Sequence, residues 1–89
     1  MSQRFAYQVC RVNFGRVTFV NDAWQGAKVP EAERKEEHIQ GCPAVAAFLQ
    51  CAGAEGWELV AVSDSFFTAP KTPPQPTPFQ VLYLKRPLA

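Results

Sequence analysis

The side chains best suited to metal chemistry in this sequence are one histidine and three cysteines. His38 and Cys42 are four residues apart, and Cys10 and Cys51 complete a Cys3His set of the type that binds zinc. The sequence has no Cys-x-x-Cys pair, and Gly41-Cys42-Pro43 interrupts the helical register that would align His38 with Cys42. We therefore expect no metal site and no cofactor, and we expect the cysteines to be reduced, small apolar side chains.

Acid–base and nucleophilic catalysis have few candidate residues. His38 is the only histidine and lies in a polar stretch, so no cysteine or serine has an obvious activating base. Glu55 and Glu58 flank a predicted turn, where solvated carboxylates are common and paired catalytic ones are rare. The sequence predicts a protein that is not an enzyme.

Arginines and aromatic residues occur together near the N-terminus. Arg4, Arg11 and Arg16 accompany Phe5, Tyr7 and Phe14, and aromatic side chains on an open sheet can stack with bases. The formal net charge is only +1, and no glycine-aromatic ribonucleoprotein motif is present. These features favour core aromatics with cations at the sheet edge over nucleic-acid binding.

Length and composition are typical of one globular domain spanning residues 1–89. Hydrophobic residues make up 47% of the chain and charged residues 19%. No apolar run is long enough to span a bilayer, and the first residues carry no apolar segment resembling a secretory signal. We expect a cytoplasmic protein that does not associate with membranes.

The rest of the chain is organised around a corner between a helix and a strand. Val45, Phe48, Leu49 and Ala52 follow helical spacing and predict a helix over residues 43–52. Gly53 is placed to close this helix in a left-handed conformation, and Gly56 allows a second bend before a strand. The predicted structural turn motif comprises Gly53, Gly56, Trp57 and Glu58. Both glycines follow the helix, which favours a turn over a phosphate-binding loop.

Alternating and β-branched patterns predict strands on both sides of this corner. The expected strands cover residues 5–14, 17–20 and 79–85, with a short returning strand near Trp24 and another starting at Trp57. Residues 28–41 form a polar insertion without an apolar stripe, expected to be a solvated helical turn or a loop. Residues 69–78 form a proline-rich loop, for which a stiff connector is favoured over a ligand for a partner's aromatic groove.

The strands are apolar on both faces, which requires a cover on both sides. Phe79, Val81 and Tyr83 alternate with Leu82 and Leu84, and Trp57 and Leu59 alternate with Val60 and Val62. We expect an α+β fold, a small, mostly antiparallel sheet of three to five strands with one helix packed on one face. The second face is covered either by the hairpin of residues 17–24 folding over it or by another subunit.

Three segments resemble the bacterial "domain of unknown function four-one-seven-seven" family. These are Phe5-Ala6-Tyr7-Gln8-Val9, Gly53-Ala54-Glu55-Gly56-Trp57-Glu58-Leu59-Val60 and Leu82-Tyr83-Leu84-Lys85-Arg86-Pro87. The resemblance implies a short first strand, one helix before the G-A-E-G-W-E-L-V corner, and a last strand ending in K-R-P. The insertion over residues 16–42 and the proline-rich loop depart from the family's short form. The resemblance implies no activity.

Together these features predict a non-enzymatic protein-interaction module, either a homodimer or a small accessory subunit of a larger assembly. The expected partner is therefore a second copy or a larger protein complex. The candidate interface residues are Phe5, Tyr7, Val9, Trp24, Val81 and Tyr83. The alternative is a small-molecule or nucleic-acid binding domain that uses aromatic residues and arginines on the sheet.

Overall fold

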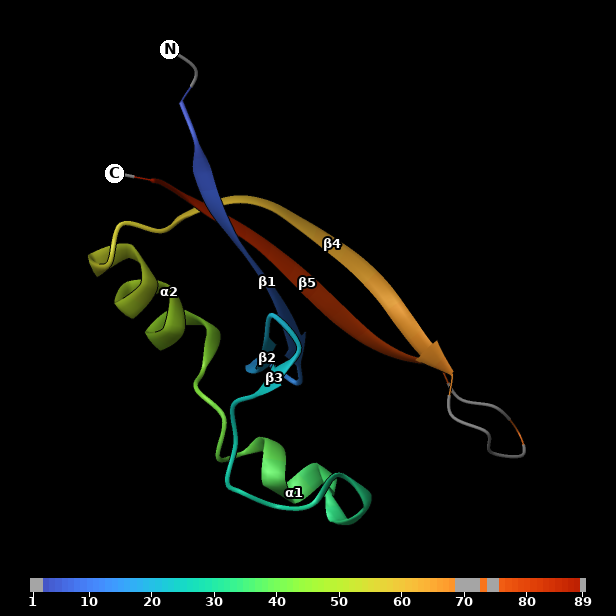
Figure 1. The fold of residues 1–89 in the computed structure, drawn as a ribbon. Helices are drawn as coiled ribbons and strands as arrows, with labels where there is room; N and C mark the ends of the chain where they lie inside the picture. Colours follow the sequence, from blue (N-terminus) through green and yellow to red (C-terminus); the bar gives the residue numbers. More distant parts are fainter. Residues whose placement is uncertain (1–2, 69–72, 74–75, 89) are drawn as a thin grey trace.

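A computed structural model describes residues 3–68, 73 and 76–88 of the chain. Within these residues the fold is α+β, with one open, five-stranded antiparallel sheet in the order β3-β2-β1-β5-β4 (Figure 1). The strands are β1 (Phe5–Asn13), β2 (Arg16–Val20), β3 (Ala23–Trp24), β4 (Glu58–Thr68) and β5 (Pro76–Pro87). The predicted α+β class and the antiparallel sheet are therefore confirmed.

Two tight turns connect the first three strands. Phe14 and Gly15 have φ angles of 52° and 73°, and Asn21 and Asp22 have φ angles of 47° and 67°. Two successive left-handed residues match the twist of the flanking strands, which is why such two-residue loops favour glycine, asparagine and aspartate. The side chain of Asn21 also accepts a 2.9 Å hydrogen bond from the Val9 N–H.

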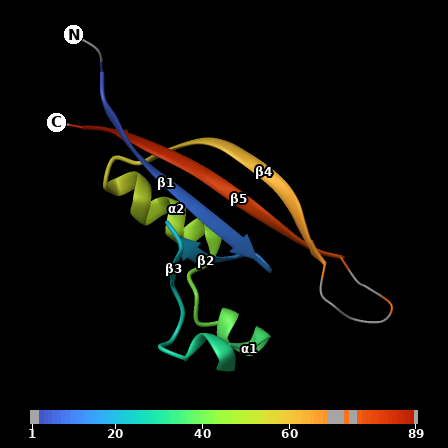
Figure 2. The same ribbon diagram turned by 45° about the vertical axis from the view of Figure 1, so that its right-hand side comes forward.

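The β2–β3 hairpin extends the sheet and does not fold over its second face. β2 pairs with β1, and β3 pairs with β2 as the outermost strand. Of the two covers considered for the second face, the folded-over hairpin is therefore ruled out. The two consecutive tight turns keep all three strands in one sheet, as both views show (Figures 1 and 2).

The described residues form two α-helices and one 3-10 turn, where the sequence predicted one packed helix and a solvated helical turn or a loop in the insertion. The short elements η1 (Glu31–Glu33) and α1 (Glu36–Ile39) lie in the polar insertion, and α2 (Val45–Ala54) precedes the corner. The helix predicted from residue 43 starts two residues later, because Pro43 and the extended Ala44 precede its first turn.

At the end of the helix, the left-handed residue is not the glycine that was predicted. Gly53 lies inside α2, and the left-handed residue is Gly56, with a φ of 91°. The Trp57 N–H donates to the Ala52 carbonyl and the Gly56 N–H to the Gly53 carbonyl, both at 3.0 Å. This pair of hydrogen bonds defines a Schellman motif and satisfies carbonyls that the helix itself leaves free.

The core lies on one face of β1 and β5. Its buried residues are Cys10, Val12, Val17, Ala52, Leu82 and Leu84, and Val45, Phe48, Leu49 and Trp57 pack against them. Cys10 lies opposite Leu82 in the β1–β5 register, so the predicted alternation of both strands is confirmed. Most of the core therefore comes from two central strands and from α2.

An irregularity in β4 changes the predicted faces of that strand. Leu59 lies opposite Leu84 and Ala61 lies opposite Tyr83, so Val60 is an extra residue in a bulge. The prediction that Leu59 and Val62 occupy opposite faces is wrong, because the bulge shifts the alternation by one residue.

The proline-rich loop is shorter than predicted at its C-terminal end. Pro76 and Pro78 belong to β5 and lie opposite Thr68 and Phe66 of β4. The β1 pairing of β5 reaches only Gln80, so beyond it β5 has β4 as its single neighbour. A proline is tolerated in this part of β5 because its nitrogen can face the side of the strand that has no hydrogen-bonding neighbour. Residues 69–72, 74 and 75 of the predicted loop lie outside the described residues.

Candidate interaction surface and neighbouring cavities

The sheet face opposite the core is called here the open face, and all six predicted interface residues lie on it. In the strand registers, Val9 lies opposite Tyr83, Arg11 opposite both Val81 and Phe19, and Phe19 opposite Trp24. Directly opposed residues of antiparallel strands share a face, and so do alternate residues of one strand. The open face therefore includes Phe5, Tyr7, Val9, Trp24, Val81 and Tyr83. The sequence pattern predicted this set, although two strands, β2 and β1, lie between Trp24 on β3 and Val81 on β5.

Cations cover part of the open face. The Lys85 ammonium lies 4.5 Å from the centroid of the Phe5 ring, and the Arg11 guanidinium lies 4.2 Å from that of Phe79. Such cation–π contacts shield the ring faces from water and leave the charges at the surface. Tyr7 and Val9 remain exposed, with 63% and 44% of their surface accessible.

The outer edge of β4 is a second surface, which the sequence pattern did not identify. Among the residues that the structure describes, β4 is the last strand of the sheet and is 11 residues long, with only β5 beside it. Its large apolar side chains are exposed on both faces of the sheet: Leu59, Val60, Val62, Phe66 and Phe67. This strand contains neither lysine nor proline, and the features in it that limit pairing along an edge are the charged Asp64 and the bulge at Val60. The sequence signal that could have identified this edge is the run of apolar residues in β4, which contains no lysine or proline.

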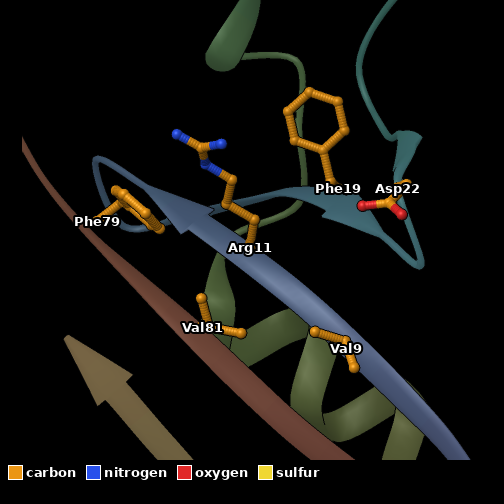
Figure 3. A pocket seen from close by; sticks show the side chains of 6 residues that line it. All are labelled: Val9, Arg11, Phe19, Asp22, Phe79 and Val81. Atoms are coloured by element: carbon orange, nitrogen blue, oxygen red, sulfur yellow. The ribbon is translucent and has the colours of Figure 1, made fainter. Parts of the chain in front are cut away.

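A cavity of about 310 Å³ opens on the sheet between β2, β1 and β5 (Figure 3). In this view Phe79 and Phe19 stand on either side of the Arg11 side chain, with Val9 and Val81 at the base. Asp22, in the turn after β2, supplies the one carboxylate of the lining.

A larger cavity, of about 500 Å³, lies between the sheet and the α1 segment. It shares Arg11 and Phe19 with the first and adds Trp24 from β3 and Arg34 from the polar insertion. The Arg34 guanidinium lies 4.8 Å from the centroid of the Trp24 ring. Arg34 had not been singled out from the sequence, because a cation in a polar insertion is usually solvated.

The residues considered for metal or nucleophilic chemistry are not assembled into a site. Within residues 3–68, 73 and 76–88, no group of three or more histidine, cysteine, aspartate or glutamate side chains could hold a metal ion. Cys10 and Cys42 are buried and Cys51 is exposed. The His38 Nδ1 accepts a 2.8 Å hydrogen bond from the Lys35 N–H, which engages the imidazole at the start of α1.

Burial controls the chemistry of two of the thiols. Desolvation raises the pKa of the Cys10 thiol to about 11. Desolvation also raises the pKa of the Cys42 thiol, and the nearby Arg16 charge opposes that rise. A raised pKa disfavours the thiolate, so neither buried cysteine is prepared to act as a nucleophile or as a metal ligand.

The Gly53–Glu58 corner has a structural role in this fold. The Arg86 Nη1 donates a 3.1 Å hydrogen bond to the Glu55 carbonyl, and its guanidinium lies 4.4 Å from the Trp57 ring centroid. Glu58 is exposed as the first residue of β4. These contacts attach the end of α2 to the last strand, β5.

No family model, curated protein or solved structure matches this chain. The resemblance to the domain family named above therefore stays a prediction. The longest helix of the described residues, α2, has ten residues, about half the length that a bilayer requires, and no other helix there could span one.

Proposed function

We propose that the protein is a non-enzymatic interaction module that forms a homodimer by pairing β4 with β4 of a second copy. The observation that carries this proposal is the unpaired outer edge of β4, which extends over eleven residues. An edge strand offers free backbone N–H and C=O groups to another strand. Antiparallel pairing along this edge would exchange backbone hydrogen bonds with the second copy, interrupted at the Val60 bulge of each strand.

The sequence of β4 is compatible with pairing to itself. In a symmetric antiparallel pair centred on Ser63, the Glu58 end of one strand meets the Thr68 end of the other. Each Asp64 carboxylate then lies beside an apolar residue of the partner strand and not opposite a second carboxylate, which would be repulsive. The exposed residues Phe66 and Phe67 approach the apolar Leu59–Val60 end of the second copy.

The edge is favoured over the open face as the principal contact. Arg11 and Lys85 already cover the rings of Phe79 and Phe5, so less bare apolar surface remains there. The open face has no free backbone groups, because its central strands are paired on both sides. Edge pairing would join two sheets into one and leave Tyr7, Val9 and Tyr83 as a continuous surface for a larger assembly.

The finer arrangement of the fold is part of the same proposal, with α2 as the one helix packed on one face of the sheet. Its support is the buried Ala52 of α2 in the cluster that contains Leu82 and Leu84. A ten-residue helix cannot cover five strands, which is consistent with the exposure of Val62 on β4.

Two matched variants test the proposal by sedimentation at micromolar concentration. Phe66→Lys places a charge on the β4 edge, at a residue that is 68% exposed. Tyr7→Lys places a charge on the open face, at an aromatic residue of similar exposure. Phe66→Lys should weaken the dimer about tenfold or more, because a charge would be buried between apolar residues. Tyr7→Lys should leave the dimer intact, and circular dichroism should show both variants folded.

The opposite pattern would contradict edge pairing and assign the contact to the open face. A wild-type protein that sediments as a monomer would contradict homodimerisation, and the edge would then be left for a strand from a larger assembly.

A further inference from the structure

The larger cavity is an open hollow with the size of a small-molecule site. Its volume of about 500 Å³ falls within the range of about 300–1,000 Å³ that is usual for ligand pockets. The sheet contributes Arg11, Phe19 and Trp24 to the lining, and the segment that leads into α1 contributes Arg34 and Lys35. The lining therefore combines flat aromatic rings with cationic groups.

Aromatic rings hold both guanidinium groups in place. Arg34 lies 4.8 Å from the Trp24 ring centroid and 5.9 Å from that of Phe19. Arg11 lies 4.2 Å from the Phe79 ring centroid. Stacking leaves the edge of a guanidinium available, and that edge matches the geometry of a carboxylate or a phosphate.

The polar groups of these two arginines are not fully satisfied within the described residues. The Nε atoms of Arg11 and Arg34 are both buried, and neither has a hydrogen-bond partner there. Buried N–H groups normally have a partner, so two such atoms on one cavity need an explanation. An anion held by the adjoining Nη groups would place negative charge beside both Nε groups and compensate their burial.

The charge balance of the cavity points in the same direction. Arg11, Arg34 and Lys35 supply three positive charges, and Glu36 is the one carboxylate of the lining. The whole chain has a formal net charge of only +1, so positive charge is concentrated at this location. Concave cationic sites attract anions from solution.

We propose that this cavity binds a small organic anion in which a carboxylate or phosphate is attached to a flat, ring-containing group. The guanidinium groups of Arg11 and Arg34 bind the anionic group. The ring packs among Phe19, Trp24 and Phe67, and all three of these residues line the cavity. The cavity shares Phe67 with β4, but the two arginines that bind the anion lie outside β4, so anion binding and strand pairing are tested by different variants.

Titrations with three probes separate the parts of this proposal. Benzoate carries a ring and a carboxylate, adenosine 5′-monophosphate carries a ring system and a phosphate, and benzyl alcohol is a neutral analogue of benzoate. Binding is followed in 15N-edited NMR spectra by the Nε–H signals of the arginines and by the indole N–H signal of Trp24. The Trp57 indole belongs to the α2–β4 corner and is the internal control.

At least one charged probe should shift the Trp24 and arginine signals in a saturable manner, while Trp57 and the benzyl alcohol titration show little change. Saturation by benzoate alone identifies a carboxylate ligand, and saturation by the nucleotide alone identifies a phosphate ligand. Equal binding of benzyl alcohol, or no shift up to millimolar concentrations of either charged probe, would overturn the proposal.

A variant pair tests the assigned residues with the probe that saturates. Arg34→Gln should weaken binding about tenfold, because it removes one of the two guanidinium groups. Lys85→Gln removes a cation stacked on Phe5, outside the cavity, and should leave the affinity unchanged. The NMR spectrum of each variant also reports whether it is folded. Equal affinity of Arg34→Gln and the wild type would contradict the assignment.

Discussion

Val62 and Leu82 lie directly opposite each other on β4 and β5, yet 50% of the Val62 surface is exposed against 3% of that of Leu82. Leu82 belongs to the core cluster to which α2 contributes, whereas Val62 is on the outermost strand. The apolar surface of the sheet therefore continues one strand beyond its cover. This continuation is the physical basis for the proposed association through β4.

The two glycines at the end of α2 should respond in opposite ways to alanine. Gly56 has a φ of 91°, so Gly56→Ala forces a Cβ into the left-handed region and should lower the free energy of unfolding by about 1 kcal/mol. Gly53 lies within α2, and a Cβ there would meet no atom within 4 Å. Gly53→Ala should therefore raise the free energy of unfolding by about 0.5–1 kcal/mol. Urea unfolding measures both values. Equal effects of the two substitutions would contradict the assigned Schellman motif.

Thr18 is a buried polar residue of β2 at a register shift between β1 and β2, where Arg11 lies opposite Phe19 and Val12 lies opposite Val17. The Thr18 Oγ1 lies 2.7 Å from the Asn13 Oδ1, and 1% of the residue is exposed. Thr18→Val preserves the shape but leaves the Asn13 side chain without this donor, so the free energy of unfolding should fall by about 1–2 kcal/mol. Thr18→Ser keeps the hydroxyl and is the control for the hydrogen bond. A valine variant as stable as the wild type would show that solvent satisfies Asn13.

The three cysteines should differ in reactivity. Cys51 is exposed, whereas Cys10 and Cys42 are buried and have raised thiol pKa values. At pH 8 an aromatic disulfide reagent should therefore modify one thiol per folded chain quickly, and Cys51→Ala should abolish that fast phase. All three thiols should react in denaturant. Three fast thiols in the folded protein would contradict the buried core position of Cys10.

The Cys10 thiol should also make the stability fall at alkaline pH. Its pKa is raised from 9.0 to about 11 on folding, so between these values the unfolded chain releases this proton more readily than the folded chain. The unfolded state is then favoured as the pH rises, and the free energy of unfolding falls across this range. Cys10→Ala should remove this part of the slope, whereas Cys51→Ala should retain it. If the free energy of unfolding depends on pH in the same way for Cys10→Ala and Cys51→Ala between pH 9 and 11, the raised pKa of the Cys10 thiol is contradicted.

The two central strands were predictable from the sequence because their alternation is regular. Tyr7 and Val9 alternate with Cys10 and Val12, and the structure exposes the first pair and buries the second. A period of two assigns both faces of a strand as long as no residue is inserted. Five of the six predicted residues of the open face follow from this regularity, and the sixth, Trp24, reaches it through the pairing of β3 with β2.

The errors in the prediction come from single-residue irregularities and from long-range pairing. One extra residue at Val60 reverses the alternation in β4, and no local pattern indicates such a bulge. The prolines at 76 and 78 are compatible with a strand only because β1 does not reach that part of β5, which is a property of the whole sheet. The strand order, and with it the exposed edge of β4, also depends on contacts between distant segments.

The larger cavity could not be predicted either, because it also depends on contacts between distant segments. Arg34 and Trp24 are ten residues apart in the sequence, and their stacking depends on the path of the polar insertion across the sheet. Composition had indicated arginines and aromatic residues on the sheet without showing which of them share a cavity. The sequence therefore predicted the types of residue involved but not their grouping.

Residue-resolved amide hydrogen exchange in β4, measured at two protein concentrations, tests the central claim most directly. If β4 pairs with β4 of a second copy, alternate amides of residues 58–68 will exchange slowly at high concentration and faster on dilution. Amides in the β1–β5 ladder will serve as the control, because their pairing lies within one chain. Exchange in β4 that is equally fast at both concentrations would contradict the proposed dimer.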